Sequence, residues 1–164
     1  MVATVGAITV ELGLGETWQA VMVGAMRHIK ALRSGLPDRH GFDGADGWTI
    51  HIEGAAGEVA VAKATGRYWG ATVNTFKAGG DVGEVQVRTR SRHDYELLVR
   101  PDDRDADIYV HVTGRVPSFR IHGWLSGTEA KREEYLRAHG ARPLAYFVPT
   151  DALHPIETLP GRVP

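Results

Sequence analysis

The chain has 164 residues, of which 43% are hydrophobic and 24% are charged. This composition is typical of one globular domain, and it excludes a disordered chain, a collagen-like repeat and a charged tail. The chain has no cysteine, which excludes disulfides, thiolate zinc sites and cysteine nucleophiles. Its net charge of -1 provides no global field for nucleic acid, so such a partner needs a local basic patch.

The N-terminal part of the chain is predicted to contain a strand and a helix. Residues 7–12 alternate as a short strand does, until Gly13 and Gly15 interrupt it. From Glu16 to Arg33, apolar residues recur at three- and four-residue spacing, which predicts an amphipathic helix. Its apolar face comprises Trp18, Val21, Met22, Ala25, Ile29 and Leu32, and its polar face comprises Gln19, Arg27, Lys30 and Arg33. Residues 36–47 are rich in Gly, Asp and Pro and are predicted to form an exposed loop.

The middle of the chain is predicted to be a helix of small residues followed by strands. Residues 54–66 are mainly Gly and Ala, which suits a helix packed closely on a sheet and capped by Gly66. Alternation and β-branched or aromatic content predict strands over residues 68–76, 84–89, 107–113 and 119–125. Residues 128–139 are predicted to form a charged surface helix, and residues 146–148 a final edge strand.

Residues 79–89 contain the side chains that most clearly indicate a chemical function. Side chains two apart on a strand point the same way, so Glu84 and Gln86 should emerge together, and Asp81 can converge on Glu84 across a glycine bend. Two neighbouring carboxylates repel unless a cation lies between them, and such oxygen ligands suit Mg²⁺ or Mn²⁺. A tight turn that leads into an exposed strand face is the alternative interpretation.

With the helix that precedes it, this cluster resembles the PD-(D/E)XK nucleases over about residues 50–126. In that family a helix, a three-stranded meander, a helix and a strand carry one acid on the second strand and (D/E)-x-K on the third, often with a Glu on the first helix. The chain is most similar to small phage-borne members, in three segments. These segments are Glu53-Gly54-Ala55-Ala56-Gly57-Glu58, Asp81-Val82-Gly83 and Arg88-Thr89-Arg90.

The resemblance implies a single nuclease-like α/β domain over residues 1–164, with a restriction-endonuclease-like fold in which helices flank a central mixed β-sheet. It implies a divalent-metal-dependent DNA endonuclease that hydrolyses phosphodiester bonds. The catalytic residues would be Glu58, Asp81, Glu84 and Gln86. Asp81, Glu84 and the carbonyl of Val85 would hold Mg²⁺ or Mn²⁺, and Glu58 would hold a second metal ion or its waters.

Two of these positions have alternatives. Gln86 stands where the family usually has lysine. An amide orients the attacking water without lowering its pKa, so the metal ion would have to lower the pKa of that water. Glu58 is otherwise a solvated helix carboxylate, whereas Glu53 lies about 140° away around an ideal helix and is less suited as a ligand.

Four basic residues surround the predicted site and could contact DNA phosphates: Lys77, Arg88, Arg90 and Arg92. An almost equally good interpretation is that these basic side chains lie in solvent at the end of a strand and do not contact DNA. The glutamine at position 86 also leaves open a catalytically weak or inactive DNA- or partner-binding module on the same fold. An accessory phage protein without a nucleic-acid role is a third alternative, and a homodimer remains open.

The expected location is the cytoplasm, without a membrane partner. The apolar stretches are shorter than the roughly 18 residues that a membrane span needs. Glu11 and Glu16 stand where a secretory leader would be basic and then apolar. If the chain is phage-encoded, the compartment is the host cytoplasm.

Overall fold

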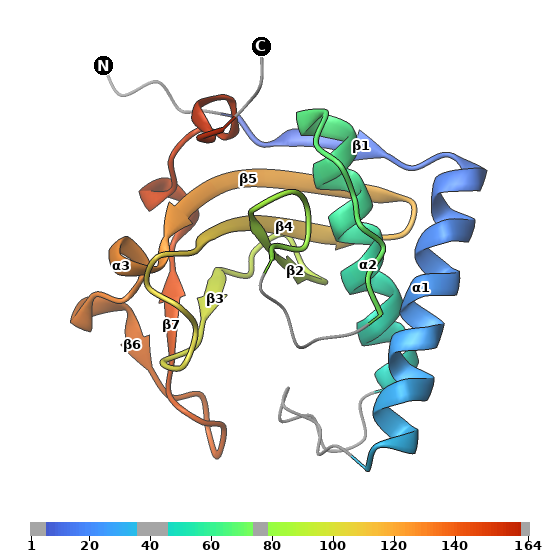
Figure 1. Cartoon of the computed structure of the whole chain (residues 1–164). Helices are drawn as coiled ribbons and strands as arrows, with labels where there is room; N and C mark the ends of the chain where they lie inside the picture. The colour runs from blue at the N-terminus through green and yellow to red at the C-terminus, as the bar shows by residue number, and fades with distance from the viewer. Residues whose placement is uncertain (1–5, 36–45, 74–78, 162–164) are drawn as a thin grey trace.

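The computed structural model describes residues 6–35, 46–73 and 79–161, and its centre is a four-stranded mixed sheet (Figure 1). The strand order is β1 (Ile8–Glu11), β5 (Ser118–Ser126), β4 (Ile108–Arg115) and β2 (Gln86–Arg90). The pairs β1–β5 and β5–β4 are antiparallel, whereas β2 runs parallel to β4. The mixed sheet with helices packed against it confirms the predicted α/β class, and the restriction-endonuclease-like fold stays a prediction.

One long helix packs on one face of this sheet, and a second long helix packs on the first. Figure 1 shows α2 (Gly47–Thr65) crossing the sheet, with α1 (Leu14–Arg33) on its outer side. The small residues of α2 allow this approach: a Cβ atom on Gly57 would lie 2.0 Å from the hydroxyl oxygen of Thr89 on β2. The helix ends as predicted, at Gly66 in the left-handed conformation with a φ of 68°.

A second, three-stranded sheet packs beside the first. Its antiparallel strands are ordered β3 (Leu97–Val99), β7 (Ala145–Val148) and β6 (Leu136–Arg137). Alternation along β4 divides the two cores, since Val110 packs with α2 and Tyr109 packs with Leu97 and Val148. The remaining short elements are α3 (Gly127–Ala130) and the 3₁₀ turns Glu133–Tyr135, Thr150–Ala152 and Ile156–Thr158.

Three predicted elements differ in the structure. Among the described residues of the range 68–76, the only strand-like pairing is the isolated bridge from Trp69 to Val82, and residues 74–76 lie outside the described part. The helix predicted over 128–139 is wrong, because α3 ends at Ala130 and β6 follows. Lys131 leaves the helix where its ammonium group binds the carbonyl of Pro101. The strand predicted at 146–148 exists, but it is the central strand of the second sheet.

The loop predicted over residues 36–47 falls mostly on residues outside the described part. Its last two residues belong to the start of α2: the carboxylate of Asp46 accepts a hydrogen bond of 3.0 Å from the backbone N–H of Trp48, and Gly47 is the first helical residue. Asp46 therefore caps the helix.

The orientation of α1 is opposite to that of an ordinary amphipathic helix. The residues that pack against α2 are small, with Ala20 and Gly24 buried, while Trp18 and the rest of the large apolar face point outward. A Cβ atom on Gly24 would lie only 2.5 Å from the Cα atom of Ile52. Because a backbone atom cannot yield as a side chain can, this close crossing requires glycine.

Buried His111 makes the stability of the fold depend on pH. Burial, and then the nearby ring of His122, lower the pKa of His111 to about 3, and its Nε2 atom lies 2.9 Å from the carbonyl oxygen of Tyr95. The folded protein therefore holds this imidazole neutral, whereas the unfolded chain protonates it near pH 6.5. The stability that it contributes is present above pH 6.5 and is lost as the pH falls toward 3.

We predict that the free energy of unfolding falls between pH 6.5 and pH 5 with a slope of up to about 1.4 kcal/mol per pH unit from this residue. In the His111→Asn variant that slope should be shallower, whatever the stability of the variant at neutral pH. Urea denaturation followed by circular dichroism measures both, and His139→Asn, at an exposed position, controls for the loss of a histidine. Identical slopes for the wild type and His111→Asn would contradict this prediction.

Candidate functional site

A cavity of about 640 Å³ lies beside the parallel pair of strands β2 and β4. Its lining comes from residues 79–81 and Glu84, from Gln86 and Arg88 of β2, and from residues 102–104 and 106–109. The structure thus brings together three predicted catalytic residues, Asp81, Glu84 and Gln86, with one predicted DNA-binding residue, Arg88. All four contribute to the lining of this one cavity.

A tight turn positions Asp81 at the start of β2. The backbone N–H of Asp81 donates to the carbonyl of Val85 at 2.8 Å, and Val82 and Val85 form an isolated bridge. The carboxylate of Asp81 accepts a hydrogen bond of 2.9 Å from the backbone N–H of Val87. Gly80 makes the turn possible, since a Cβ atom there would lie 2.5 Å from the backbone of Glu84 and Val85.

This turn corrects two predictions. The strand begins at Gln86, so Glu84 lies in the turn with an exposed side chain rather than on the predicted strand face. The carbonyl of Val85, predicted as a metal ligand, accepts hydrogen bonds from the N–H groups of both Asp81 and Val82, at 2.8 and 3.2 Å. Since both lone pairs of this carbonyl are used, the structure does not offer Val85 as a ligand.

Glu58 is buried in a network of its own. Arg27 of α1 binds both of its oxygens, at 2.7 and 2.9 Å, and the indole N–H of Trp69 donates to Oε2 at 2.8 Å. Burial raises the pKa of Glu58, as does the nearby Asp81 carboxylate, against the opposing effects of Arg27 and Trp69. The solvated-carboxylate interpretation is therefore wrong, and a role as second metal ligand would require Arg27 to leave.

The far wall of the cavity holds Arg88 in place. Its guanidinium group lies 3.0 Å from the carboxylate of Asp103 and 4.9 Å from the ring centroid of Tyr109. Burial, and then Asp103, raise the pKa of Tyr109 to about 12, and its hydroxyl donates to the carbonyl of Arg104. Tyr109 therefore acts as a neutral wall at physiological pH.

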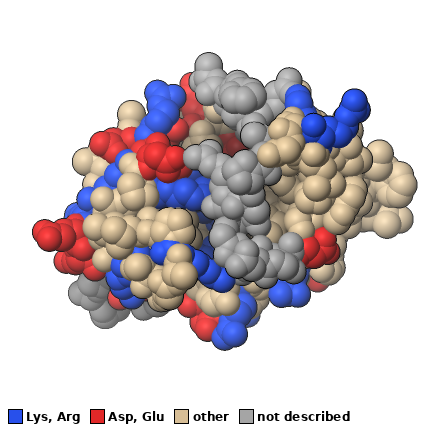
Figure 2. Space-filling view, turned by 90° about the horizontal axis from the view of Figure 1, so that it is seen from below, with Lys and Arg blue, Asp and Glu red and all other residues tan. Residues whose placement is uncertain are grey.

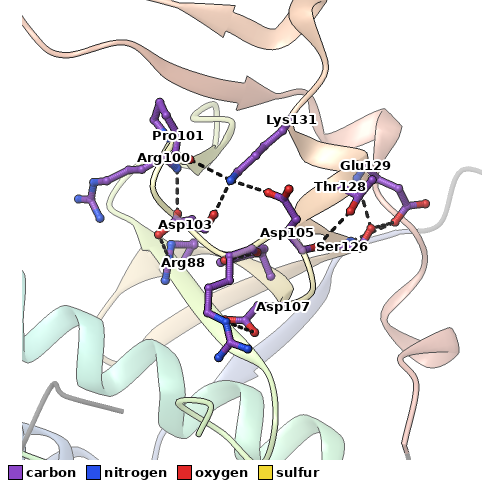
Figure 3. Close-up of polar contacts among 12 residues, drawn as sticks. Arg88, Arg100, Pro101, Asp103, Asp105, Asp107, Ser126, Thr128, Glu129 and Lys131 are labelled. Carbon is purple, nitrogen blue, oxygen red and sulfur yellow. Dashed lines mark hydrogen bonds and ion pairs between the residues drawn. The ribbon is translucent and has the colours of Figure 1, made fainter. Parts of the chain in front are cut away.

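The segment that carries Asp103 is fastened from the other side by Lys131 (Figure 3). The ammonium group of Lys131 donates to the carbonyls of Pro101 and Asp103 and lies 2.6 Å from a carboxylate oxygen of Asp105. The side chain of Lys131 is only 15% exposed, so these bonds are largely shielded from water. Because the ammonium group of Lys131 binds three oxygen atoms of one loop, the loop that forms this wall of the cavity is rigid.

Two of the other predicted DNA-binding residues, Arg90 and Arg92, also have intramolecular partners. Arg90 lies 4.7 Å from the ring centroid of Tyr95, and burial lowers its pKa. Arg92 binds the carboxylate of Asp94 at 2.8 Å, and Lys77 lies outside the described residues. Figure 2 shows basic and acidic side chains interspersed on the face seen from below. DNA contact by these residues stays a prediction.

Sequence reasoning missed the residues that line the cavity from before β4 and the residue of α1 that binds Glu58. Asp102, Asp103 and Asp107 stand in an acidic run that is evident in the sequence, but only the pairing of β2 with β4 places this run opposite Arg88. Arg27 is 31 residues from Glu58 along the chain, and its place on the polar face of a helix was the only available signal.

The donor atoms at the cavity fit a sparsely ligated divalent cation. Within residues 6–35, 46–73 and 79–161, no group of three metal-ligating side chains converges. Asp81 and Glu84 nevertheless provide carboxylates to the same cavity, and Gln86 provides a carboxamide. Mg²⁺ is commonly held by one or two carboxylates, several waters and a substrate phosphate, which are donors of this kind.

Comparison with known proteins gives no match to a family model, to a curated protein or to a solved structure. The nuclease resemblance therefore depends on the sequence motifs alone. In the part of the chain that the structure describes, no helix has both the length and the apolarity to cross a membrane.

We predict that Asp103→Ala lowers the free energy of unfolding by about 1–3 kcal/mol, because it leaves the partly buried Arg88 guanidinium and the backbone N–H of Arg100 without this acceptor. The matched control is Asp94→Ala, which removes the exposed partner of Arg92 and should leave stability unchanged. Thermal denaturation of the three proteins tests this difference. Equal melting temperatures would show that the Arg88–Asp103 pair contributes nothing to the wall.

Proposed function

We propose that this protein is a metal-dependent nuclease that hydrolyses phosphodiester bonds of DNA in the cavity beside β2 and β4. The observation that carries the proposal is the convergence of Asp81, Glu84 and Gln86 on one cavity of about 640 Å³. These are the residues that the motif indicates as catalytic. The cavity is of the size that binding sites for small molecules usually have, which supports entry of a nucleotide unit.

The two carboxylates have a defined task in this proposal. Asp81 and Glu84 would hold Mg²⁺ or Mn²⁺ together with waters and a phosphate oxygen. When bound, such an ion polarises the phosphodiester and lowers the pKa of a coordinated water. The hydrogen bond from the N–H of Val87 fixes one oxygen of Asp81, so its carboxylate has a set orientation before any ligand arrives.

In this proposal, Gln86 orients the attacking water and Arg88 binds a phosphate oxygen, in place of the lysine that the family usually has. The Gln86 carboxamide can accept a hydrogen bond from the attacking water and orient it, although it cannot take up the proton. Arg88 follows two residues later on the same strand, and its side chain also lines the cavity. Its guanidinium group has five N–H donors, so it can bind a phosphate oxygen while Asp103 retains another donor.

A single metal ion fits this arrangement better than two. Glu58, the predicted holder of a second ion, has both oxygens bound by Arg27 and one also by Trp69. Removing Arg27 would leave a carboxylate buried without its cation, which costs several kcal/mol. Glu58 therefore acts in this proposal as a structural neighbour of Asp81.

A second candidate function is a DNA-binding module without turnover. The amide at Gln86 favours it, as does the Glu58 carboxylate, whose partner Arg27 lies within the chain. Such a module would bind DNA through the same cavity and leave it intact. Both candidate functions predict DNA binding, but only the nuclease predicts DNA cleavage.

The deciding experiment incubates the full chain with single- and double-stranded DNA in Mg²⁺ or Mn²⁺ and measures cleavage and binding in parallel. We expect metal-dependent cleavage that Asp81→Asn and Glu84→Gln reduce at least about 100-fold, and that Gln86→Ala reduces about tenfold to a thousandfold. Glu134→Gln, an exposed acid outside the cavity, is the matched control and should retain full activity.

The possible results separate the two candidates. Binding without cleavage in either metal would support the module without turnover and contradict the nuclease. Cleavage that persists in Asp81→Asn would place the reaction outside this cavity, provided that circular dichroism shows the variant to be folded.

A further inference from the structure

The outward face of α1 carries large apolar side chains along its whole length. Between 45% and 89% of each of these residues is exposed, whereas the helix packs on α2 through Ala20 and Gly24. The exposed residues are Leu14, Trp18, Met22, Met26, Ile29 and Leu32. Figure 2 shows few charged side chains toward the right-hand edge, the side on which Figure 1 places α1.

The spacing of this face is that of a seam between two helices. Trp18, Met22, Ala25, Ile29 and Leu32 follow one another at intervals of four, three, four and three residues. The mean interval of about 3.5 residues is the repeat of a left-handed coiled coil, in which such a row stays in contact with a partner helix. A helix that only had to cover its own core would not need this outward row.

The exposed area is close to what a stable dimer buries. A large side chain offers on the order of 200 Å² when it is free, so the six residues together expose on the order of 600–700 Å². That is at or above the largest apolar patch of a typical monomer, roughly 300–600 Å², and near the roughly 800 Å² that each partner buries in a standard interface.

The charges at the two ends of α1 favour one orientation of a partner helix. Glu16 lies in the first turn, and Lys30 and Arg33 lie in the last turn. The Glu16 carboxylate already binds Lys63 of α2 at 2.9 Å, so the basic ends decide the orientation. An antiparallel second copy separates the Lys30 and Arg33 ends of the two helices and opposes the two helix dipoles. A parallel copy would set Lys30 and Arg33 against their own counterparts.

We propose that two copies of this chain form a homodimer through the outward faces of their α1 helices, packed antiparallel about a two-fold axis near Met22. Such an interface is isologous, since each helix contributes the same face. In this arrangement Trp18 of one copy packs near Ile29 of the other, and Leu14 packs near Leu32. The interface lies on the opposite side of α1 from α2, and the proposal does not depend on nuclease activity.

Sedimentation tests the association. The wild type should sediment as a dimer with twice the 17.9 kDa mass of the chain at micromolar concentration. Trp18→Glu should weaken the dimer at least tenfold, because it places a carboxylate in the buried seam. The matched control is Leu144→Glu, which makes the same kind of change at a residue 53% exposed beside β7. A wild type that is monomeric at about 100 µM, or a Trp18→Glu dimer as tight as the wild type, would overturn the proposal.

Cross-linking tests the orientation, and the absence of cysteine from the chain makes single-cysteine variants clean reporters. With a short bis-maleimide, Met22→Cys should cross-link to itself across the two-fold axis. Leu14→Cys should not, because the two copies of that residue would be separated by about 25 Å along the helices. A mixture of Leu14→Cys and Leu32→Cys should give the mixed dimer. Self-cross-linking of Leu14→Cys would overturn the antiparallel arrangement.

Discussion

The buried carboxylate of Glu58 determines how three parts of the molecule meet. A charge in this position is tolerated only with a cation and hydrogen-bond donors beside it, and these come from Arg27 and Trp69. Arg27 also donates to the carbonyl of Thr72 at 2.8 Å, so the segment after α2 is bound to α1 as well. Glu58 thus joins α1, α2 and this segment at one point.

The candidate site depends on that junction. Trp69 forms a bridge with Val82, and the N–H of Gly83 donates to the carbonyl of Tyr68 at 2.9 Å. The turn that carries Asp81 is therefore fixed on one side by the segment bound to Glu58 and on the other by β2. The same junction orients α1: the face with Arg27 must turn toward α2, and Gly24 on that side permits the close crossing. The apolar face is left outward, where we propose that a second copy covers it.

Local patterns predicted the elements whose structure depends on local forces. Alternation identified β1, β4 and β5 to within one or two residues, and Gly66 marked the end of α2. Periodicity identified α1 as amphipathic but could not show which face is buried, because α1 packs on α2 through its own small residues, Ala20 and Gly24. The charged run after Thr128 resembles a helix, yet Lys131 binds a loop 30 residues earlier in the chain.

In the candidate site, too, the residues that are close in sequence could be predicted, and those that depend on strand pairing could not. Asp81, Glu84 and Gln86 are close in sequence, so their place at one cavity could be predicted, although Glu84 lines it from the turn and not from the predicted strand face. The opposite wall with Asp103 and Tyr109 comes from the parallel pairing of β2 with β4, for which the sequence has no local signal. The hydrogen bonds that the Val85 carbonyl accepts could likewise not be predicted from the sequence, since they depend on how tightly the turn closes.

In the proposed nuclease, Asp81 and Glu84 bind a divalent cation in the cavity beside β2. Anomalous diffraction from crystals soaked in Mn²⁺ tests it most directly, because the signal locates the ion without any assay of activity. The account predicts one anomalous peak within coordination distance of carboxylate oxygens of both Asp81 and Glu84, absent from crystals of Asp81→Asn treated in the same way. A saturating soak that leaves these two carboxylates without a peak, or that places the ion at other residues, would contradict it.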